Sequence, residues 1–223
     1  TDQGTTPDAT QQQAPGVPKL IPGDIAPYSL YMLLTGQPAV VIASPPGAGK
    51  STLLTVVAGN AVHASGLTIG IACQRSAQAE DLAHKFGAIA PDVPVTLVGS
   101  SKARMPDDLP DNVEYTKTMT GTKGPTGARV IISTSAKWAW TRKDRLHTPL
   151  DMLFIDEAWQ LTWADFSTIA GLAPQYLLVG DPGQIDPVVT ADTSRWVGRR
   201  TAPHLPSPTV LMHRRPDDTL EQR

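Results

Sequence analysis

A glycine-rich segment between two apolar runs contains the first residues that could carry out chemistry. Ser44 to Thr52 reads Ser-Pro-Pro-Gly-Ala-Gly-Lys-Ser-Thr and follows the apolar run 39–43. Glycines allow backbone N–H groups to close around phosphate oxygens, a lysine neutralises the β and γ oxygens, and a following hydroxyl holds Mg²⁺. We therefore expect Lys50 and Ser51 to meet a nucleoside triphosphate and its metal.

These residues fit the P-loop pattern G-x-x-x-x-G-K-[ST] except at its first position, where Ser44 replaces glycine. A serine makes the same turn as long as its φ angle stays negative, and the two following prolines stiffen the loop. A helix that begins at the end of the loop would add its positive N-terminal end to the phosphate site. The predicted nucleotide-binding residues of this segment are Pro46, Gly47, Ala48, Gly49, Lys50, Ser51 and Thr52.

An acidic pair follows a second apolar run. Residues 152–155 read Met-Leu-Phe-Ile and lead into Asp156 and Glu157. If this run is a parallel strand, its carboxyl end lies in the crevice where α/β sheets bind ligands. We expect Asp156 to share Mg²⁺ with Ser51, and Glu157 to orient or deprotonate the attacking water. An exposed acidic pair without a role is the simpler alternative, and the upstream loop argues against it.

A glutamine follows a third apolar run. Residues 176–179 read Tyr-Leu-Leu-Val and precede Gly-Asp-Pro-Gly-Gln-Ile-Asp-Pro at residues 180–187. Gly-Asp-Pro-Gly is typical of turns, so a plain exit from a strand is one interpretation. The other is catalytic, because Gln184 stands just past the strand end, where a side chain that senses the γ-phosphate is needed.

In this order, the three segments resemble motifs I, II and III of superfamily 1 DNA/RNA helicases, in particular those whose motif II reads D-E-A-x-Q. The resemblance implies that the chain is the first RecA-like ATPase domain of such a helicase, with ATP and Mg²⁺ as cofactors. It also implies that Gln160 of motif II and Gln184 of motif III lie near the γ-phosphate and couple hydrolysis to movement of the bound strand. The implied partners are single-stranded nucleic acid, DNA or RNA, and a second RecA-like domain, either in a missing part of the chain or in another protein.

Three further segments resemble helicase motifs. Residues 67–78 resemble motif Ia and residues 130–135 resemble a motif at a strand end, and both are implied to touch the nucleic-acid backbone. Residues 211–216, Leu-Met-His-Arg-Arg-Pro, resemble motif IV, whose arginine reaches the γ-phosphate. Either Arg214 or Arg215 matches that arginine, and we favour Arg214.

The apolar runs alternate with helix-like segments, which is typical of an α/β fold. Strands are expected at residues 39–43, 67–73, 95–98, 130–133, 152–155, 176–179 and 209–212, and helices at 51–64, 77–87 and 159–171. Such alternation predicts a parallel sheet with helices on both faces, and the resemblance implies the RecA-like sheet of P-loop NTPases. We expect one domain over residues 25–223, after a disordered tail rich in Pro, Gln and Thr at residues 1–24. Residues 99–128 are poor in apolar side chains and are predicted to form an irregular surface insertion.

Composition limits the class of protein. The 223 residues carry a net charge of −2, so the chain as a whole is not a basic nucleic-acid binder, although a narrow single-strand track is compatible with that charge. No apolar run approaches the length of a membrane span and no signal pattern is visible, so we expect a cytoplasmic protein without a membrane partner. The single cysteine, Cys73, lies in an apolar run and is expected to be buried rather than catalytic, and the histidines lack the spacing of metal ligands.

One basic stretch contains two tryptophans. Its members are Lys137, Trp138, Trp140, Arg142, Lys143 and Arg145. A tryptophan beside cations can stack on a nucleobase. Core tryptophans with solvated basic residues are an equally good interpretation.

Two functions from different classes follow. The first is a helicase motor domain that binds and hydrolyses ATP, with Lys50, Glu157, Gln184 and Arg214 as catalytic residues. Because the chain does not begin with Met and ends just after the motif IV-like segment, we expect a fragment that hydrolyses ATP weakly on its own. The alternative is a nucleotide-gated switch that binds another protein and does not unwind nucleic acid.

Overall fold

A single sheet of eight strands organises the chain in a computed structural model. The structure describes residues 25–120, 125–215 and 219–221. The strands are β1 (Ala39–Ala43), β2 (Ile69–Cys73), β3 (Val95–Val98), β4 (Val113–Thr116), β5 (Val130–Thr134), β6 (Met152–Ile155), β7 (Gln175–Gly180) and β8 (Thr219–Glu221). The α-helices are α1 (Ile25–Leu34), α2 (Lys50–Ser65), α3 (Ser76–Ile89), α4 (Ser135–Ala139), α5 (Trp163–Ile169) and α6 (Ser207–Arg214).

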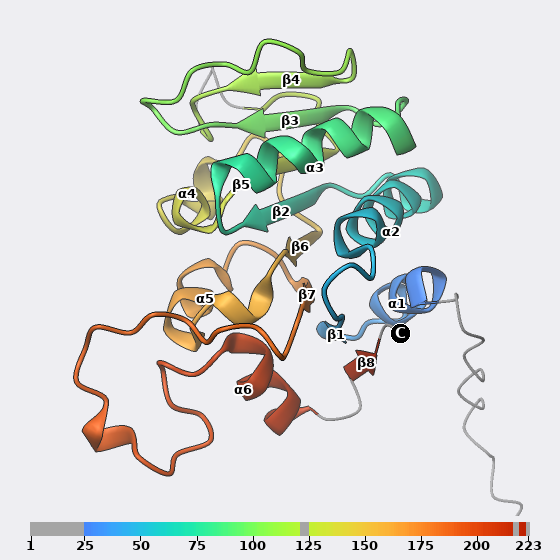
Figure 1. The fold of residues 1–223 in the computed structure, drawn as a ribbon. Coiled ribbons are helices and arrows are strands. Elements are labelled where there is room, and N and C mark those ends of the chain that lie inside the picture. The colour runs from blue at the N-terminus through green and yellow to red at the C-terminus, as the bar shows by residue number, and fades with distance from the viewer. Residues whose placement is uncertain (1–24, 121–124, 216–218, 222–223) are drawn as a thin grey trace, which may run out of the picture.

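All of these strands are parallel, in the order β4-β3-β5-β2-β6-β7-β1-β8 (Figure 1). Parallel neighbours require crossover connections of a dozen or more residues, which explains why helices separate most of the apolar runs. None of the helices in the described part of the chain has the length and apolar content that crossing a membrane requires.

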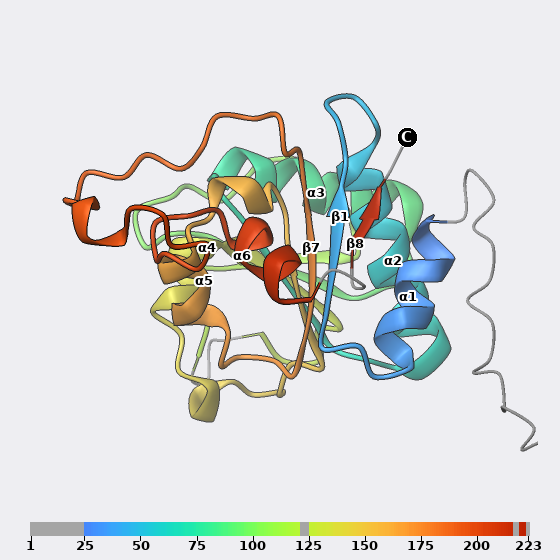
Figure 2. The ribbon, with the colours of Figure 1, turned by 90° about the horizontal axis from the view of Figure 1, so that it is seen from below.

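Helices cover both faces of the sheet, as Figure 2 shows. On one face α1, α2 and α3 pack against alternate strand residues such as Val40, and on the other α4, α5 and α6 pack against residues such as Val41. The sequence prediction of a parallel sheet with helices on both faces is therefore confirmed. Cys73 is fully buried in the first of these layers, where burial raises the pKa of its thiol, so it is a core residue as expected.

The carboxyl ends of the strands bring three of the motifs to one edge. Strand β7 lies between β1 and β6, so the loop after β1 and the acidic pair after β6 flank the end of β7. Backbone hydrogen bonds hold these exits in register: the Ser44 amide donates to the Gly180 carbonyl at 2.8 Å, and the Asp156 amide donates to the Ala72 carbonyl at 2.9 Å. The sheet order thus gathers segments that are far apart in sequence.

The prediction of a strand at residues 209–212 is wrong. These residues lie in helix α6, which begins beside Pro206 and has Pro208 in its first turn. Proline is favoured at the start of a helix because its φ angle is already helical and its missing N–H would have no intrahelical partner. A run of four apolar residues is too short to distinguish a buried helix turn from a strand.

In the described residues of the predicted irregular insertion at 99–128, namely 99–120 and 125–128, there is one regular element. Strand β4 lies there and pairs with β3, with Val113 opposite Val95. Val113 is the one buried residue of β4, so this edge strand lacks the apolar run that marked the others.

The predicted helix over residues 159–171 is also divided. A 3-10 turn at Ala158–Gln160 precedes α5, and Thr162 between them caps α5 by accepting a hydrogen bond from the Asp165 amide at 3.0 Å. The predicted tail at residues 1–24 lies outside the described residues, so the domain boundary near residue 24 stays a prediction.

Candidate nucleotide-binding site

The glycine-rich loop makes the turn that its sequence predicts. Gly47 and Gly49 have φ angles of 78° and 80°, in the left-handed region that glycine adopts at little cost. Ser44 is fully buried at the start of the loop. It is not among the non-glycine residues with positive φ in the described ranges, so serine is accommodated here in the way that the sequence suggests.

Lys50 and Ser51 form the first turn of α2, directly after Gly49. The unpaired N–H groups of this turn and the helix dipole favour negative charge at this end of the helix. The Nζ atom of Lys50 lies 3.7 Å from Oε1 of Glu157, and the two side chains are 10% and 15% exposed. The predicted lysine and the predicted general base therefore meet at the edge of the sheet.

Asp156 is the most enclosed charged group of the site. It is 5% exposed, and its Oδ1 accepts a hydrogen bond from the Glu157 amide at 3.0 Å. Burial, and secondarily the adjacent Glu157 carboxylate, raises the pKa of Asp156 to about 6, while Lys50 and Lys85 act in the opposite direction. A carboxyl group in this setting gains most from a nearby cation.

Glu157 is held in an unusual backbone conformation. Its φ angle is 50°, and it is the one non-glycine residue with positive φ in the described ranges. Its Oε2 atom is buried and has no hydrogen-bond partner among the described residues. A buried carboxylate oxygen without a partner is costly, so its retention here favours a role toward a bound group.

The two glutamines of the later motifs contact one another. Nε2 of Gln160 donates to Oε1 of Gln184 at 3.1 Å, which joins the turn after β6 to the turn after β7. This contact between the two glutamines was not predicted from the sequence. Contact with a γ-phosphate stays a prediction for both.

The last residue of β7, Gly180, packs directly against the turn that follows β6. Gly180 leaves no room for a side chain, because a Cβ atom there would lie 2.9 Å from the Ala158 nitrogen and 2.9 Å from Cε3 of Trp159. One residue later, Oδ1 of Asp181 accepts a hydrogen bond from the Gly183 amide at 2.8 Å. Close backbone packing therefore fixes the two glutamine-bearing turns relative to each other.

A polar cavity of about 370 Å³ lies beside these groups. Its lining residues come from α2, α3 and the end of β6, and they are Ser51, Gln78, Asp81, His84, Lys85, Asp156 and Glu157. Ser51 and Asp156, the predicted metal ligands, share this cavity. Asp81, His84 and Lys85 were not predicted from the sequence, although their recurrence at steps of three to four positions after Gln78, the last residue of the motif Ia-like segment, was a visible signal.

The donor set fits a magnesium–triphosphate group. Within the described residues, no cluster of three or more His, Cys, Asp or Glu side chains is arranged to hold a metal by itself. Mg²⁺ usually takes one or two carboxylates together with phosphate oxygens, which matches a single hydroxyl and a single buried carboxylate. The glycine turns, the lysine and the free Oε2 atom of Glu157 complete a site for an anion and its cation.

Arg214 lies elsewhere in the described structure. Its guanidinium carbon stands 5.1 Å from the centre of the Trp163 ring, a cation–π contact that connects α6 to α5. No ion pair or hydrogen bond joins it to the other predicted site residues in the described ranges. Its predicted role at the γ-phosphate, and the choice between it and Arg215, stay predictions.

The two tryptophans of the basic stretch have opposite environments. Trp138 is fully buried, and its Nε1 donates to the Ile71 carbonyl at 2.9 Å. Trp140 is 89% exposed, two residues before an ion pair between Arg142 and Asp144. The interpretation as a core residue is therefore correct for Trp138, whereas Trp140 is free to stack on a ligand.

Residues 30–207 match the family model described as AAA domain. The chain belongs to this family. The match includes the glycine-rich loop, the acidic pair and both glutamines, which are the residues that the sequence singled out. A comparison with curated protein sequences gives no match.

Solved structures share the fold of this AAA domain. It is similar to the Sulfolobus solfataricus SWI2/SNF2 ATPase core in complex with dsDNA, with a TM-score of 0.50 and 16% identity over 70% of this chain and 30% of that one. It is also similar to two structures of UvsW from bacteriophage T4, each with a TM-score of 0.53 over 73% of this chain. The identities are 15% and 14%, and the shares of those chains are 30% and 53%.

These likenesses confirm the predicted fold, a RecA-like parallel sheet of the P-loop class with helices on both faces. The chain spans 30% of the first two of these structures and about half, 53%, of the third. The activity and partners of a longer protein are therefore a matter of proposal.

Proposed function

We propose that this chain is the ATP-binding and ATP-hydrolysing motor domain of a superfamily 1 nucleic-acid helicase. The observation that carries the proposal is that Ser51, Asp156 and Glu157 line one polar cavity at the carboxyl edge of a parallel sheet, with the Lys50 ammonium 3.7 Å from Glu157. The order of the motifs in the sequence, the AAA domain family and the helicase-type fold support it. The same observations favour ATP and Mg²⁺ as its cofactors.

When bound, the magnesium–triphosphate group supplies a phosphorus atom that is open to in-line attack by water. The backbone N–H groups of Gly47 and Gly49 and of the first turn of α2 would hold phosphate oxygens, whereas Pro46 has no N–H and the Ala48 amide donates to the Pro45 carbonyl. The Lys50 ammonium would neutralise the charge of the β and γ oxygens. Ser51 and Asp156 would hold the metal, and the cation would keep Asp156 ionised despite its raised pKa.

Glu157 would act on the water. Its carboxylate stands 3.7 Å from the Lys50 ammonium, so it is placed beside the phosphate-binding lysine and can accept a proton from an attacking water. The left-handed backbone of Glu157 directs it differently from the neighbouring Asp156. Two adjacent carboxylates are thereby given two roles.

Gln160 and Gln184 would relay the state of the γ-phosphate. Their hydrogen bond links the turn after β6 to the turn after β7, so a displacement of one glutamine would move the segment that carries the other. We propose that this link couples hydrolysis to movement of a single strand of DNA or RNA. A second RecA-like domain, in a longer chain or in a partner, would supply the arginine that completes the site, beside or in place of Arg214.

A steady-state ATPase assay of the 223-residue chain tests the proposal. We expect Mg-ATP binding with slow turnover, whether or not a single-stranded oligonucleotide is present, because an arginine from another domain commonly supplies about 10³–10⁵ in rate. Rapid, strand-stimulated turnover by this chain alone would contradict the need for a second domain. Failure to bind Mg-ATP would contradict the assigned site altogether.

The variant Glu157→Gln separates binding from chemistry. It keeps the shape and the metal ligands, so we expect unchanged affinity for Mg-ATP and a loss of about 10²–10⁴ in turnover, as for a general base. Turnover at the parental rate would refute the role of Glu157. A nucleotide-gated switch would bind Mg-ATP as well, but a longer protein that contains this domain would then show no stimulation by single strands.

A further inference from the structure

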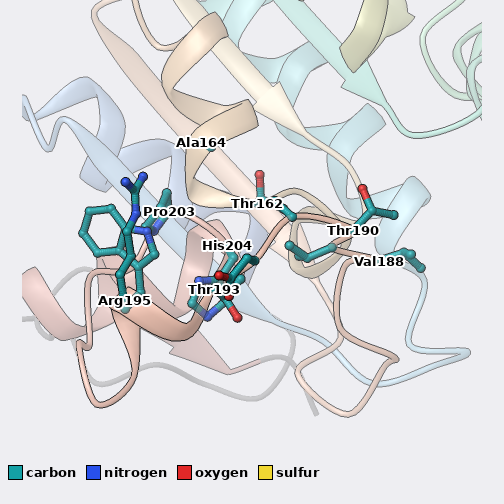
Figure 3. A pocket seen from close by; sticks show the side chains of 12 residues that line it. Thr162, Ala164, Val188, Thr190, Thr193, Arg195, Pro203 and His204 are labelled. Atoms are coloured by element: carbon teal, nitrogen blue, oxygen red, sulfur yellow. The ribbon is translucent and has the colours of Figure 1, made fainter.

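A second cavity lies between the segment that follows β7 and the start of α5, away from the nucleotide site. Its volume is about 360 Å³. Figure 3 shows Arg195 and Pro203 at one end, Val188 and Thr190 at the other, and His204 between them. Residues 182–206, which supply most of its wall, form the long excursion between β7 and α6 in Figure 1.

The wall of the cavity is mainly apolar. Val188, Val189, Ala164 and Pro203 contribute to it, and Val188 is 89% exposed. Flat aromatic ligands bind in clefts of a few hundred Å³ that combine apolar walls with a small number of polar groups. A nucleobase with part of its sugar has the size and the flat apolar faces that suit this space.

One cation, Arg195, lines the cavity, and Arg199 stacks on the same tryptophan. The guanidinium carbons of Arg195 and Arg199 lie 5.0 and 5.5 Å from the centre of the Trp196 ring, which holds both arginines in place. Neither arginine forms an ion pair within the described residues. The carboxylate of Asp192 also lines the cavity, but it accepts a hydrogen bond from the Ser194 amide at 2.9 Å. Because the Asp192 carboxylate is already bonded, the guanidinium of Arg195 is the group at this end that could hold an anion such as a phosphodiester.

Polar groups on the wall suit the edge of a base. Nδ1 of His204 is buried and has no hydrogen-bond partner among the described residues. The torsion that turns a histidine ring is soft, so a small rotation would present this nitrogen to the cavity. The hydroxyl group of Thr193 also lines the cavity, whereas that of Thr162, which lines it too, is bonded to Asp165.

We propose that this cavity takes one unstacked base of a single-stranded nucleic acid, with its phosphate on Arg195. His204 contacts the edge of the base, and the valines and Pro203 contact its faces. Stacking and phosphate contacts of this kind are what bind single strands with little regard to sequence. The inference rests on the proposed function, which supplies the class of ligand, and it adds a named base-binding site that the nucleotide site does not contain.

The position of the cavity would connect a bound base mechanically to the nucleotide site. Thr162 follows closely on Gln160, and Val188 follows closely on Gln184. The two walls of the cavity are therefore extensions of the two segments that the glutamine pair joins. A base between these walls would press on both glutamine-bearing turns.

Binding of a fluorescein-labelled oligothymidylate of about 12 nucleotides to the 223-residue chain tests the inference by fluorescence anisotropy. We expect Arg195→Ala to weaken binding about tenfold and to reduce the slope of log affinity against log salt by about one, since it removes one phosphate contact. His204→Leu should weaken binding to a similar degree without changing this slope, and His204→Asn should restore part of the affinity. Arg104→Ala is the charge-matched control, because Arg104 is an exposed residue paired with Asp107 in another part of the fold.

Binding of fluorescent Mg-ATP by every variant separates the two proposals. If the parent chain binds Mg-ATP but not the oligonucleotide, the base-binding site is refuted and the nucleotide site is untouched. If Arg195→Ala and His204→Leu bind the strand like the parent, the cavity is refuted and the strand binds elsewhere, for instance at Trp140. Loss of strand binding in both variants but not in Arg104→Ala, with Mg-ATP binding retained, supports the inference.

Discussion

The strand β7 and the segment that follows it differ sharply in how they are held. The last four residues of β7 are buried, and Gly180 is packed so tightly that no Cβ atom fits. Beyond Asp181 the chain leaves the sheet, and Ile185, Val188 and Val197 are 82–89% exposed. The contrast teaches that this fold places the proposed catalytic groups on buried strand ends and the proposed base-binding cavity on an exposed excursion.

Lys50→Ala tests the rigid part with the largest expected effect. The substitution removes the cation beside Glu157 and the phosphate oxygens, so turnover should fall by at least about a hundredfold and Mg-ATP affinity should also drop. Steady-state hydrolysis and fluorescent-nucleotide titration measure the two effects. If turnover and Mg-ATP affinity both stay at parental levels, the ends of the buried strands are not the site of hydrolysis.

Trp138→Ala tests the packing behind the rigid edge. Trp138 is fully buried and bonded to the backbone of β2, so its loss should lower the free energy of unfolding by about 3–5 kcal/mol. Trp140→Ala is the matched control: it is 89% exposed and should change stability by no more than about 0.5 kcal/mol. Equal effects in urea denaturation would show that the burial assigned to Trp138 is wrong.

Gly180→Ala tests the close approach at the end of β7. The added Cβ atom would lie 2.9 Å from backbone and ring atoms that cannot both move, so we expect a loss of about 1–3 kcal/mol in stability. Gly171→Ala is the control, because a Cβ atom there meets nothing within 4 Å and the backbone does not need positive φ. A thermal melt in which both variants match the parent would contradict tight packing at Gly180.

Val197→Ser probes the excursion and should have the smallest effect. Val197 is 82% exposed, so removal of its apolar side chain should change the unfolding free energy by no more than about 0.5 kcal/mol. Urea denaturation measures it beside Gly180→Ala. A loss comparable to that of the buried glycine would show that the excursion is packed after all and would remove the distinction between the two regions.

Buried strands that end in polar motifs were predictable from the sequence. The bounds of β1, β3 and β6 agree with the predicted ranges, because each is a short run of mainly apolar residues bounded by turn or charged residues. The meeting of Lys50 with Glu157 followed from parallel strands that end at one edge. These features depend on local pattern and on a single topological rule.

The remaining features depend on tertiary contacts that no local pattern contains. Residues 209–212 form a helix because Pro206 and Pro208 favour a helix start. The helix is also held because Leu211 and Met212 pack into the buried cluster on this face of the sheet. Strand β4 forms because its backbone pairs with β3, and Val113 is its one buried residue. The cavity around His204 depends on the path of a long irregular segment, which the sequence does not specify residue by residue.

The left-handed backbone of Glu157 sets stability against activity at one position. A φ angle of 50° costs a residue with a side chain about 1–2 kcal/mol, a cost that glycine does not bear. Glu157→Gly should therefore relieve strain while it removes the carboxylate, and a screen for thermal stability alone would favour it. Redesign of this domain for stability alone would tend to remove the carboxylate at this residue, so position 157 has to be held fixed in any such effort.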